Sequence, residues 1–202
     1  MKLKVCGMKD PENIKQVASL NPDYMGFIFY AASKRFVGED FEMPIIASEI
    51  KKVGVFVNAK ADYIIEKINR YQLDLIQLHG EETPDFCEVM NHLIPVIKAF
   101  GVNEDFNMKV LENYFACCDY FLFDTKTTEH GGSGTQFDWD LLKGYDGKLP
   151  FFISGGIGVD EICRISDRQT QFSNLIAVDV NSRFEISPGM KNVGELGKIV
   201  KL

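Results

Sequence analysis

The chain has 202 residues, of which 46% are hydrophobic and 25% charged, and its formal net charge is −7. These values fit one globular domain with a sizeable core and exclude a disordered chain. An acidic chain is a poor candidate for non-specific nucleic-acid binding, which needs a basic surface, although a local basic pocket for a small anion stays open.

Short apolar runs rich in β-branched and aromatic residues recur along the chain. Because they are apolar on both faces, they are typical of strands buried on both sides, as in a parallel sheet. We expect strands at Leu3–Cys6, Tyr24–Phe29, Lys52–Val57, Leu73–Leu78, Pro95–Phe100, Tyr120–Asp124, Pro150–Ile153 and Ile176–Val180.

Stretches with helical spacing separate these runs. The clearest begins at Asp10-Pro11-Glu12, where Asp can cap, Pro fits the first turn and Glu favours the positive end of the helix dipole. The weakest unit covers Phe41–Ile50, which Pro44 interrupts. The other predicted helices follow Asn58, begin at Thr83-Pro84-Asp85, and cover Val159–Ser166.

Eight strands in 202 residues leave about 25 residues for each strand–helix unit, which fits a doubly wound sheet or a closed (β/α)8 barrel. Glycine and polar residues gather directly after the strands, where a barrel builds its active site. We therefore expect an α/β fold in which residues 1–202 form a single (β/α)8 (TIM) barrel domain with a catalytic role.

The five cysteines show no CxxC spacing, which argues against a zinc site or a disulfide framework and favours a reducing cytosol. The first residues lack the apolar stretch of a secretory signal, and no run reaches the roughly 20 apolar residues of a membrane span. We expect a cytoplasmic protein without a membrane partner.

A phosphate site is predicted after the last two strands. Barrels commonly bind phosphate there through backbone N–H groups and a helix N-terminus. Ser154-Gly155-Gly156-Ile157-Gly158 follows the seventh strand, and glycines let amides approach an anion closely. After the eighth strand, Ser182 offers a hydroxyl.

The segment Thr125–Phe137 is the one long predicted loop, and it contains Gly131-Gly132-Ser133-Gly134. Its place after a candidate catalytic aspartate favours a lid that closes over a ligand. The alternative is an ordinary surface loop.

Cys6 and Asp124 are the candidate acid–base pair, because they end the first and sixth strands and so both face the barrel mouth. A lone cysteine is more often a small buried hydrophobic residue, and Asp124 has a structural alternative as the cap of the next loop. His79 either lines the mouth or is a hydrogen-bonded structural histidine. Lys98 either forms a Schiff base or holds a substrate anion.

Segments along the whole chain, in order, resemble the phosphoribosylanthranilate isomerase family of tryptophan biosynthesis. Single fragments are common, but their ordered combination is specific. The matching segments are Lys4–Met8, Gly26–Tyr30, Ser33–Val37, Val53–Asn58, Gln77–Gly80, Asp124–Lys126, Gly131–Gly134, Phe137–Trp139, Ser154–Ile157, Asp179–Ser182 and Ser187–Lys191.

The resemblance implies a (β/α)8 barrel that converts N-(5-phosphoribosyl)anthranilate to 1-(2-carboxyphenylamino)-1-deoxyribulose 5-phosphate by an Amadori rearrangement, without a metal or redox cofactor. It implies that Asp124 is the general acid, that Cys6 is the general base and that Arg35 holds the anthranilate carboxylate. It also places Gly155, Gly156 and Ser182 at the phosphate.

The chain departs from the family pattern at Arg183, where a glycine is usual, and at Asn181, where a serine is usual. Arg183 either adds charge to the phosphate site or lies outside it. The roles of Cys6 and Asp124 also need unusual protonation states. In water, moving a proton from thiol to carboxylate costs about 6 kcal/mol; burial of Asp124 and a cation such as Lys126 near the sulfur would reduce that cost.

Two other functions compete with this interpretation. Indole-glycerol-phosphate synthase, a neighbouring barrel of the pathway, needs a catalytic lysine, for which Lys98 alone is thin support. A non-catalytic phosphate-binding barrel would keep Gly155 and Gly156 but would not need the acid–base pair. No surplus apolar stripe is visible, so we expect a monomer.

Overall fold

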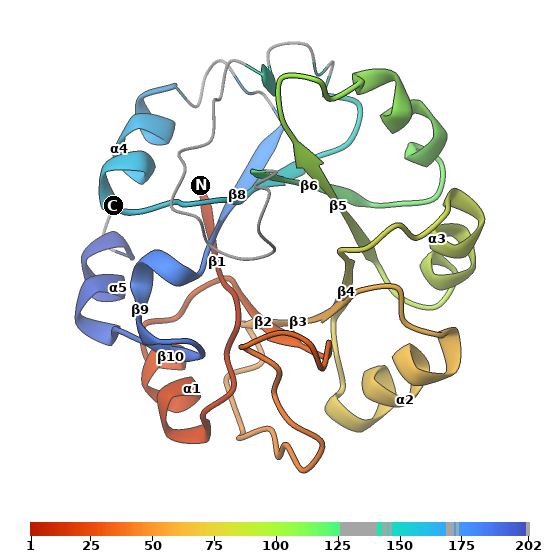
Figure 1. Cartoon of the computed structure of the whole chain (residues 1–202). Helices are drawn as coiled ribbons and strands as arrows, with labels where there is room; N and C mark the ends of the chain where they lie inside the picture. Colours follow the sequence, from red (N-terminus) through yellow and green to blue (C-terminus); the bar gives the residue numbers. More distant parts are fainter. Residues whose placement is uncertain (126–140, 143–144, 146, 169–171, 173, 201–202) are drawn as a thin grey trace.

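Eight parallel strands close into a barrel in the computed structural model (Figure 1), which describes residues 1–125, 141–142, 145, 147–168, 172 and 174–200. Each strand pairs with the next along the chain, and β8 pairs back to β1. The prediction of a barrel rather than an open doubly wound sheet is confirmed. The strands are β1 (Lys2–Val5), β2 (Tyr24–Ile28), β3 (Lys51–Phe56), β4 (Leu75–Leu78), β5 (Val96–Val102), β6 (Tyr120–Thr125), β7 (Phe151–Ile153) and β8 (Leu175–Val180).

Helices lie around the outside of this barrel (Figure 1). The predicted caps are present: the side chain of Asp10 accepts from the Asn13 N–H at 2.8 Å, and the side chain of Thr83 accepts from the Phe86 N–H at 3.3 Å, each satisfying a donor that the helix itself leaves open. The α-helices are α1 (Pro11–Ala18), α2 (Ala61–Tyr71), α3 (Pro84–Asn91), α4 (Val159–Arg168) and α5 (Val193–Ile199), and a 3-10 helix, η1, covers Met108–Tyr114.

The helical prediction for Phe41–Ile50 is wrong, because the structure has no helix between β2 and β3. Pro44 removes a backbone donor in the middle of that segment. The chain also forms elements that were not predicted: α5 and, ahead of it, the 3-10 helix η4 (Ser182–Phe184) and a hairpin of β9 (Glu185–Ser187) and β10 (Met190–Lys191).

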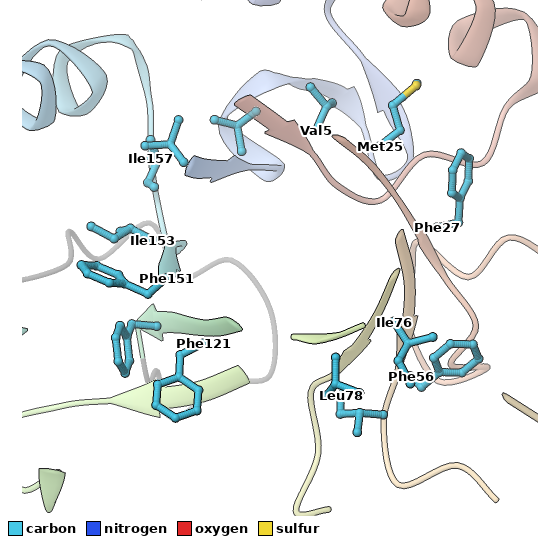
Figure 2. Close-up of a cluster of buried hydrophobic side chains, with 14 of the residues drawn as sticks. Val5, Met25, Phe27, Phe56, Ile76, Leu78, Phe121, Phe151, Ile153 and Ile157 are labelled. Atoms are coloured by element: carbon cyan, nitrogen blue, oxygen red, sulfur yellow. The ribbon is translucent and has the colours of Figure 1, made fainter. Parts of the chain in front are cut away.

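Alternation along the strands divides the core into two layers. Figure 2 shows labelled side chains of the outer layer, which pack between strands and helices. The inner layer fills the barrel and consists of Tyr24, Val53, Leu75, Ile97, Ala99, Leu122, Phe152 and Ala177. The barrel is therefore a packed core, and its functional groups must lie at the ends of the strands.

A buried ion pair joins the loops after β3 and β4 to strand β5. The Lys98 ammonium, on β5, lies 3.1 Å from the Glu82 carboxylate and donates to the carbonyl of Gly80 at 2.8 Å. Glu82 also accepts from the Asn58 and Gly80 N–H groups at 2.8 and 2.9 Å. One carboxylate thus connects two neighbouring loops and the next strand.

We expect Glu82→Gln to lower the free energy of unfolding by about 3 kcal/mol, because it leaves the Lys98 ammonium buried without its counter-charge. Urea unfolding followed by circular dichroism measures this. Glu81→Gln, at the exposed neighbouring position, is the control and should change stability by less than about 0.5 kcal/mol. Equal stability of the two variants would contradict this account.

Candidate active site

Cys6 directly follows β1 and is buried, with 4% of its surface exposed. Its N–H donates to the carbonyl of Val180 on β8 at 2.9 Å, which fixes the backbone across the seam of the barrel. On the other side lies Gly26 of β2, where an added Cβ would come within 2.7 Å of the Cys6 sulfur. The missing side chain of Gly26 therefore provides the space that the thiol occupies.

A buried ion pair of Lys4 and Asp179 neighbours Cys6. Lys4 precedes Cys6 by two residues, so both side chains point to the same face of β1. The Lys4 Nζ lies 2.9 Å from Oδ2 of Asp179, and both side chains are almost entirely buried. Lys4 and Asp179 are also directly paired in the register of β1 with β8.

Burial raises the pKa of the Cys6 thiol, and the nearby Lys4 ammonium, followed by that of Lys191, opposes this rise while Asp179 adds to it. The thiol is therefore the resting form in the free protein. A thiolate formed there is a stronger base than an ordinary one, because basicity follows pKa. Cys6 is thus a thiol at rest, whereas its role as general base needs the thiolate.

Asp124 lies on β6 with its side chain 29% exposed, and its Oδ2 lies 3.4 Å from Nε2 of His79. The side-chain amide of Gln77 lies 2.7 Å from Nδ1 of the same ring. Because an amide nitrogen donates, Nδ1 accepts, and the proton of a neutral His79 then sits on Nε2, facing Asp124. His79 therefore lines the mouth and contacts Asp124, the candidate acid. It is also hydrogen-bonded by Gln77, so it has features of both predicted interpretations.

Asp124 and Cys6 belong to one electrostatic cluster, which Asp179 connects. Burial raises the pKa of Asp179, Lys4 lowers it, and Asp124 raises it again through charge repulsion. Asp179 in turn acts on Cys6. The candidate acid and the candidate base are therefore placed at the same end of the barrel, with the ion pair of Lys4 and Asp179 as their shared neighbour.

Arg35 lies at the same mouth, paired with Glu185 of β9. Its Nε lies 2.9 and 3.0 Å from the two Glu185 oxygens, and its Nη2 lies 2.7 Å from Oε2. Glu185 also accepts from the Lys191 ammonium at 2.7 Å. No described residue accepts from Nη1, so the outer edge of the guanidinium can take a second carboxylate.

Gly7 has a left-handed φ of +75°, and an added Cβ would lie 2.7 Å from Cδ of Arg35 and 2.8 Å from Oδ1 of Asn181. Asn181 itself accepts from the Lys191 ammonium at 2.6 Å. Gly7, the residue after Cys6, thus packs directly against Arg35 and against Asn181, which binds Lys191. Arg35 and Lys191 are two further cations at the mouth.

The predicted phosphate loop follows β7, and Gly155 and Gly156 have φ values of +98° and +63°, a region that favours glycine. Both are partly exposed, and α4 begins three residues after Gly156. Ser182 begins η4 directly after Asn181. Backbone amides, a helix N-terminus and a hydroxyl thus occupy the positions where barrels bind phosphate.

Lys98, considered above as a Schiff-base lysine or an anion ligand, is 2% exposed and makes its contacts with Glu82 and backbone carbonyls. These contacts are structural. Arg183 lies in η4 with an exposed side chain, and its relation to a phosphate stays a prediction.

The predicted lid, Thr125–Phe137, lies outside the described residues apart from Thr125, as does Lys126. Within the described ranges no cluster of histidine, cysteine, aspartate or glutamate side chains is arranged to hold a metal ion. In the same part of the chain, every helix is too short or too polar to cross a membrane. All five cysteines are free thiols.

Four charged residues at the mouth were not predicted to have roles there: Lys4, Asp179, Glu185 and Lys191. Charged residues at buried strand positions need partners, so Lys4 and Asp179 in apolar strands were the available signal. Glu185 and Lys191 lie in a short hairpin whose sequence shows no strand periodicity.

A closed parallel barrel with a thiol, a carboxylate, an arginine and a glycine-rich loop at the carboxyl ends of its strands defines an acid–base barrel enzyme for an anionic substrate. The family model described as N-(5'phosphoribosyl)anthranilate (PRA) isomerase matches residues 3–202. The chain belongs to this family, and it is an isomerase of tryptophan biosynthesis.

Individual relatives agree. The N-(5'-phosphoribosyl)anthranilate isomerase of Parabacteroides distasonis is 42% identical, over all of this chain and 92% of the relative. The crystal structure of the Thermotoga maritima enzyme superimposes with a TM-score of 0.86 at 32% identity, covering 100% of this chain and 97% of that one. A phosphoribosyl anthranilate isomerase in complex with reduced 1-(o-carboxyphenylamino)-1-deoxyribulose 5-phosphate gives a TM-score of 0.82 at 29% identity, with the same coverage.

We expect Gly26→Ala to reduce kcat of the isomerase reaction by about 10- to 100-fold, because the added methyl group displaces the Cys6 sulfur. A stopped assay of initial rates measures this. Gly197→Ala on α5 is the control, since its Cβ would meet Leu20 at 3.9 Å, an ordinary contact. Full activity of the Gly26 variant would show that the sulfur position does not matter.

Proposed function

We propose that Cys6 and Asp124 perform the isomerisation of N-(5-phosphoribosyl)anthranilate to 1-(2-carboxyphenylamino)-1-deoxyribulose 5-phosphate as general base and general acid. The observation that carries this proposal is the cluster at the barrel mouth, in which the buried Cys6 neighbours a lysine–aspartate pair and Asp124 faces His79 at 3.4 Å. Two groups of opposite role at one site are what an Amadori rearrangement needs.

Asp124 and Cys6 then each make one proton transfer, and a tautomerisation follows. The carboxylic acid form of Asp124 protonates the ribose ring oxygen, the bond from C1 to that oxygen breaks, and a Schiff base forms between C1 and the anthranilate nitrogen. The thiolate of Cys6 removes the proton from C2, which gives an enolamine. Tautomerisation of the enolamine yields the amino ketose, so the reaction uses acid–base steps, and the expectation that no cofactor takes part stays a prediction.

The two anionic ends of the substrate have separate partners in this proposal. Arg35 binds the anthranilate carboxylate through the guanidinium edge that Glu185 does not use. The amides of Gly155 and Gly156 and the hydroxyl of Ser182 bind the phosphate. The distance between the loop after β7 and the hairpin of β9 and β10 then sets the length of substrate that fits.

The wider assignments are also proposals. We place the protein in the cytoplasm as a monomeric enzyme, with residues 1–202 acting as one catalytic domain and a phosphorylated small molecule as its partner, without nucleic acid or membrane. A solved relative from Thermotoga maritima, 28% identical, is described as monomers generated from a dimeric phosphoribosylanthranilate isomerase. Light scattering of the purified chain decides between monomer and dimer.

The synthase alternative is less well supported, because Lys98 alternates with the inward-facing Ile97 and Ala99 and so points to the outer layer. Its ammonium binds Glu82 and backbone carbonyls there. The non-catalytic alternative does not explain why a buried thiol lies beside a lysine–aspartate pair.

We expect Cys6→Ala and Asp124→Asn each to reduce kcat by about 100-fold or more, because each removes one proton-transfer group. Loss of anthranilate fluorescence from freshly generated substrate measures turnover. Circular dichroism verifies that each variant is folded.

The matched control is Cys163→Ala, which removes an exposed thiol on α4 and should leave kcat unchanged. Near-normal turnover of a folded Cys6 or Asp124 variant removes that residue from the mechanism. Failure of the unmodified protein to convert the substrate would refute the proposed function as a whole.

Arg35→Lys should raise KM by about tenfold or more with a smaller change in kcat. A lysine ammonium is a single point of charge, whereas the guanidinium can bind Glu185 and a second carboxylate on different edges. Initial rates over a range of substrate concentrations separate the two parameters, and an unchanged KM would place the anthranilate carboxylate elsewhere.

A further inference from the structure

Lys4 has a position that packing alone does not explain. A fully buried lysine is costly unless its charge is paired, yet Lys4 is 0% exposed and lies inside the barrel. Because residues two apart on a strand share a face, its side chain lies on the same side of β1 as the thiol of Cys6. The cross-strand register with Asp179 fixes where the ammonium can lie.

The pairing with Asp179 uses only part of the Lys4 ammonium. Asp179 contacts the ammonium through Oδ2 at 2.9 Å, whereas its Oδ1 is buried without a hydrogen-bond partner among the described residues. An ammonium has three N–H donors, so the contact with Oδ2 leaves others for the sulfur. Burial by itself would neutralise Lys4, but Asp179 and Cys6 together raise its pKa, and it keeps its charge.

The charged groups around Cys6 come from several elements. Lys4 lies on the same strand, Asp179 on β8, and Lys191 on β10, while the facing residue of β2 is the uncharged Gly26. Lys191 forms an ion pair with Glu185, and Arg35 forms an ion pair with the same carboxylate. Lys4 is thus the cation best placed to act on the sulfur, because it lies two residues before Cys6 and on the same face of the strand.

We infer that Lys4 is a positioning residue for the reaction: its ammonium stabilises the Cys6 thiolate, and Asp179 orients that ammonium. This inference rests on the proposed function for its catalytic meaning, but the effect on the sulfur is a property of the free protein. The Cys6 thiol, the Lys4 ammonium and the Asp179 carboxylate then form a row. Asp179 orients the ammonium of Lys4, and the ammonium activates the thiol. The row runs across the seam between the first and last strands of the barrel.

The test measures the ionisation of the Cys6 thiol without any turnover. The rate of alkylation by iodoacetamide is followed against pH, and mass spectrometry of tryptic peptides reports Cys6 and Cys163 separately. Lys4→Gln removes the charge but keeps a donor for Asp179, Lys4→Arg keeps the charge, and Lys2→Met removes an exposed lysine from the same strand.

We expect Lys4→Gln to raise the pH midpoint of Cys6 alkylation by about one pH unit or more, as the loss of an adjacent opposite charge does. Lys4→Arg and Lys2→Met should leave that midpoint close to its original value. Alkylation of the exposed Cys163, followed in every variant, is the internal control.

A folded Lys4→Gln variant with an unchanged Cys6 midpoint overturns the inference, and so does an equal rise in Lys4→Arg, which would show that shape rather than charge matters. If Lys4→Gln does not fold, Lys4→Met replaces it under the same criteria. The alkylation test contains no substrate, so it is independent of turnover. If Lys4→Gln raises the Cys6 midpoint as expected and the Cys6→Ala enzyme is active, the proposed role of Cys6 is rejected while the effect of Lys4 on the sulfur stands.

Discussion

The contact between the Lys4 ammonium and the Asp179 carboxylate joins the first strand of the barrel to the last. Its burial is unfavourable unless both charges remain paired, so the two strands must meet in one register. That register places Cys6 beside Val180 of β8. The separate register of β1 with β2 places it opposite Gly26, with the sulfur facing inward. Barrel closure and the chemistry of the thiol therefore depend on the same two side chains.

Opposite charges recur at the mouth in two groups. Asp179 neutralises Lys4, whereas Glu185 is shared by Arg35 and Lys191. The pair of Lys4 and Asp179 has no net charge, and the group of Arg35, Lys191 and Glu185 keeps one positive charge in excess. An anionic substrate is thus attracted by the second group, while the thiol lies next to a balanced pair.

The fold was largely predictable because each strand is a short apolar run and each strong cap has a recognisable residue. The predicted strands agree with the observed ones within two residues at either end. Cys6, Asp124 and Arg35 could be proposed as site residues because they stand at strand ends or in family segments. Their partners were not, since Arg35 and Glu185 are 150 residues apart and Lys4 and Asp179 are 175 residues apart. Such pairs follow from closure of the barrel, which local patterns do not encode.

The order of the residues along the chain sets an order in which the cluster can be completed during synthesis. Cys6 and Arg35 precede their partners: Asp179 on β8, and Glu185 and Lys191 in the hairpin of β9 and β10, are synthesised later. Until the later segments are present, Lys4 lacks the carboxylate of Asp179 and Arg35 lacks that of Glu185. Both contacts therefore form only when β8 has closed the barrel and the hairpin has packed against it.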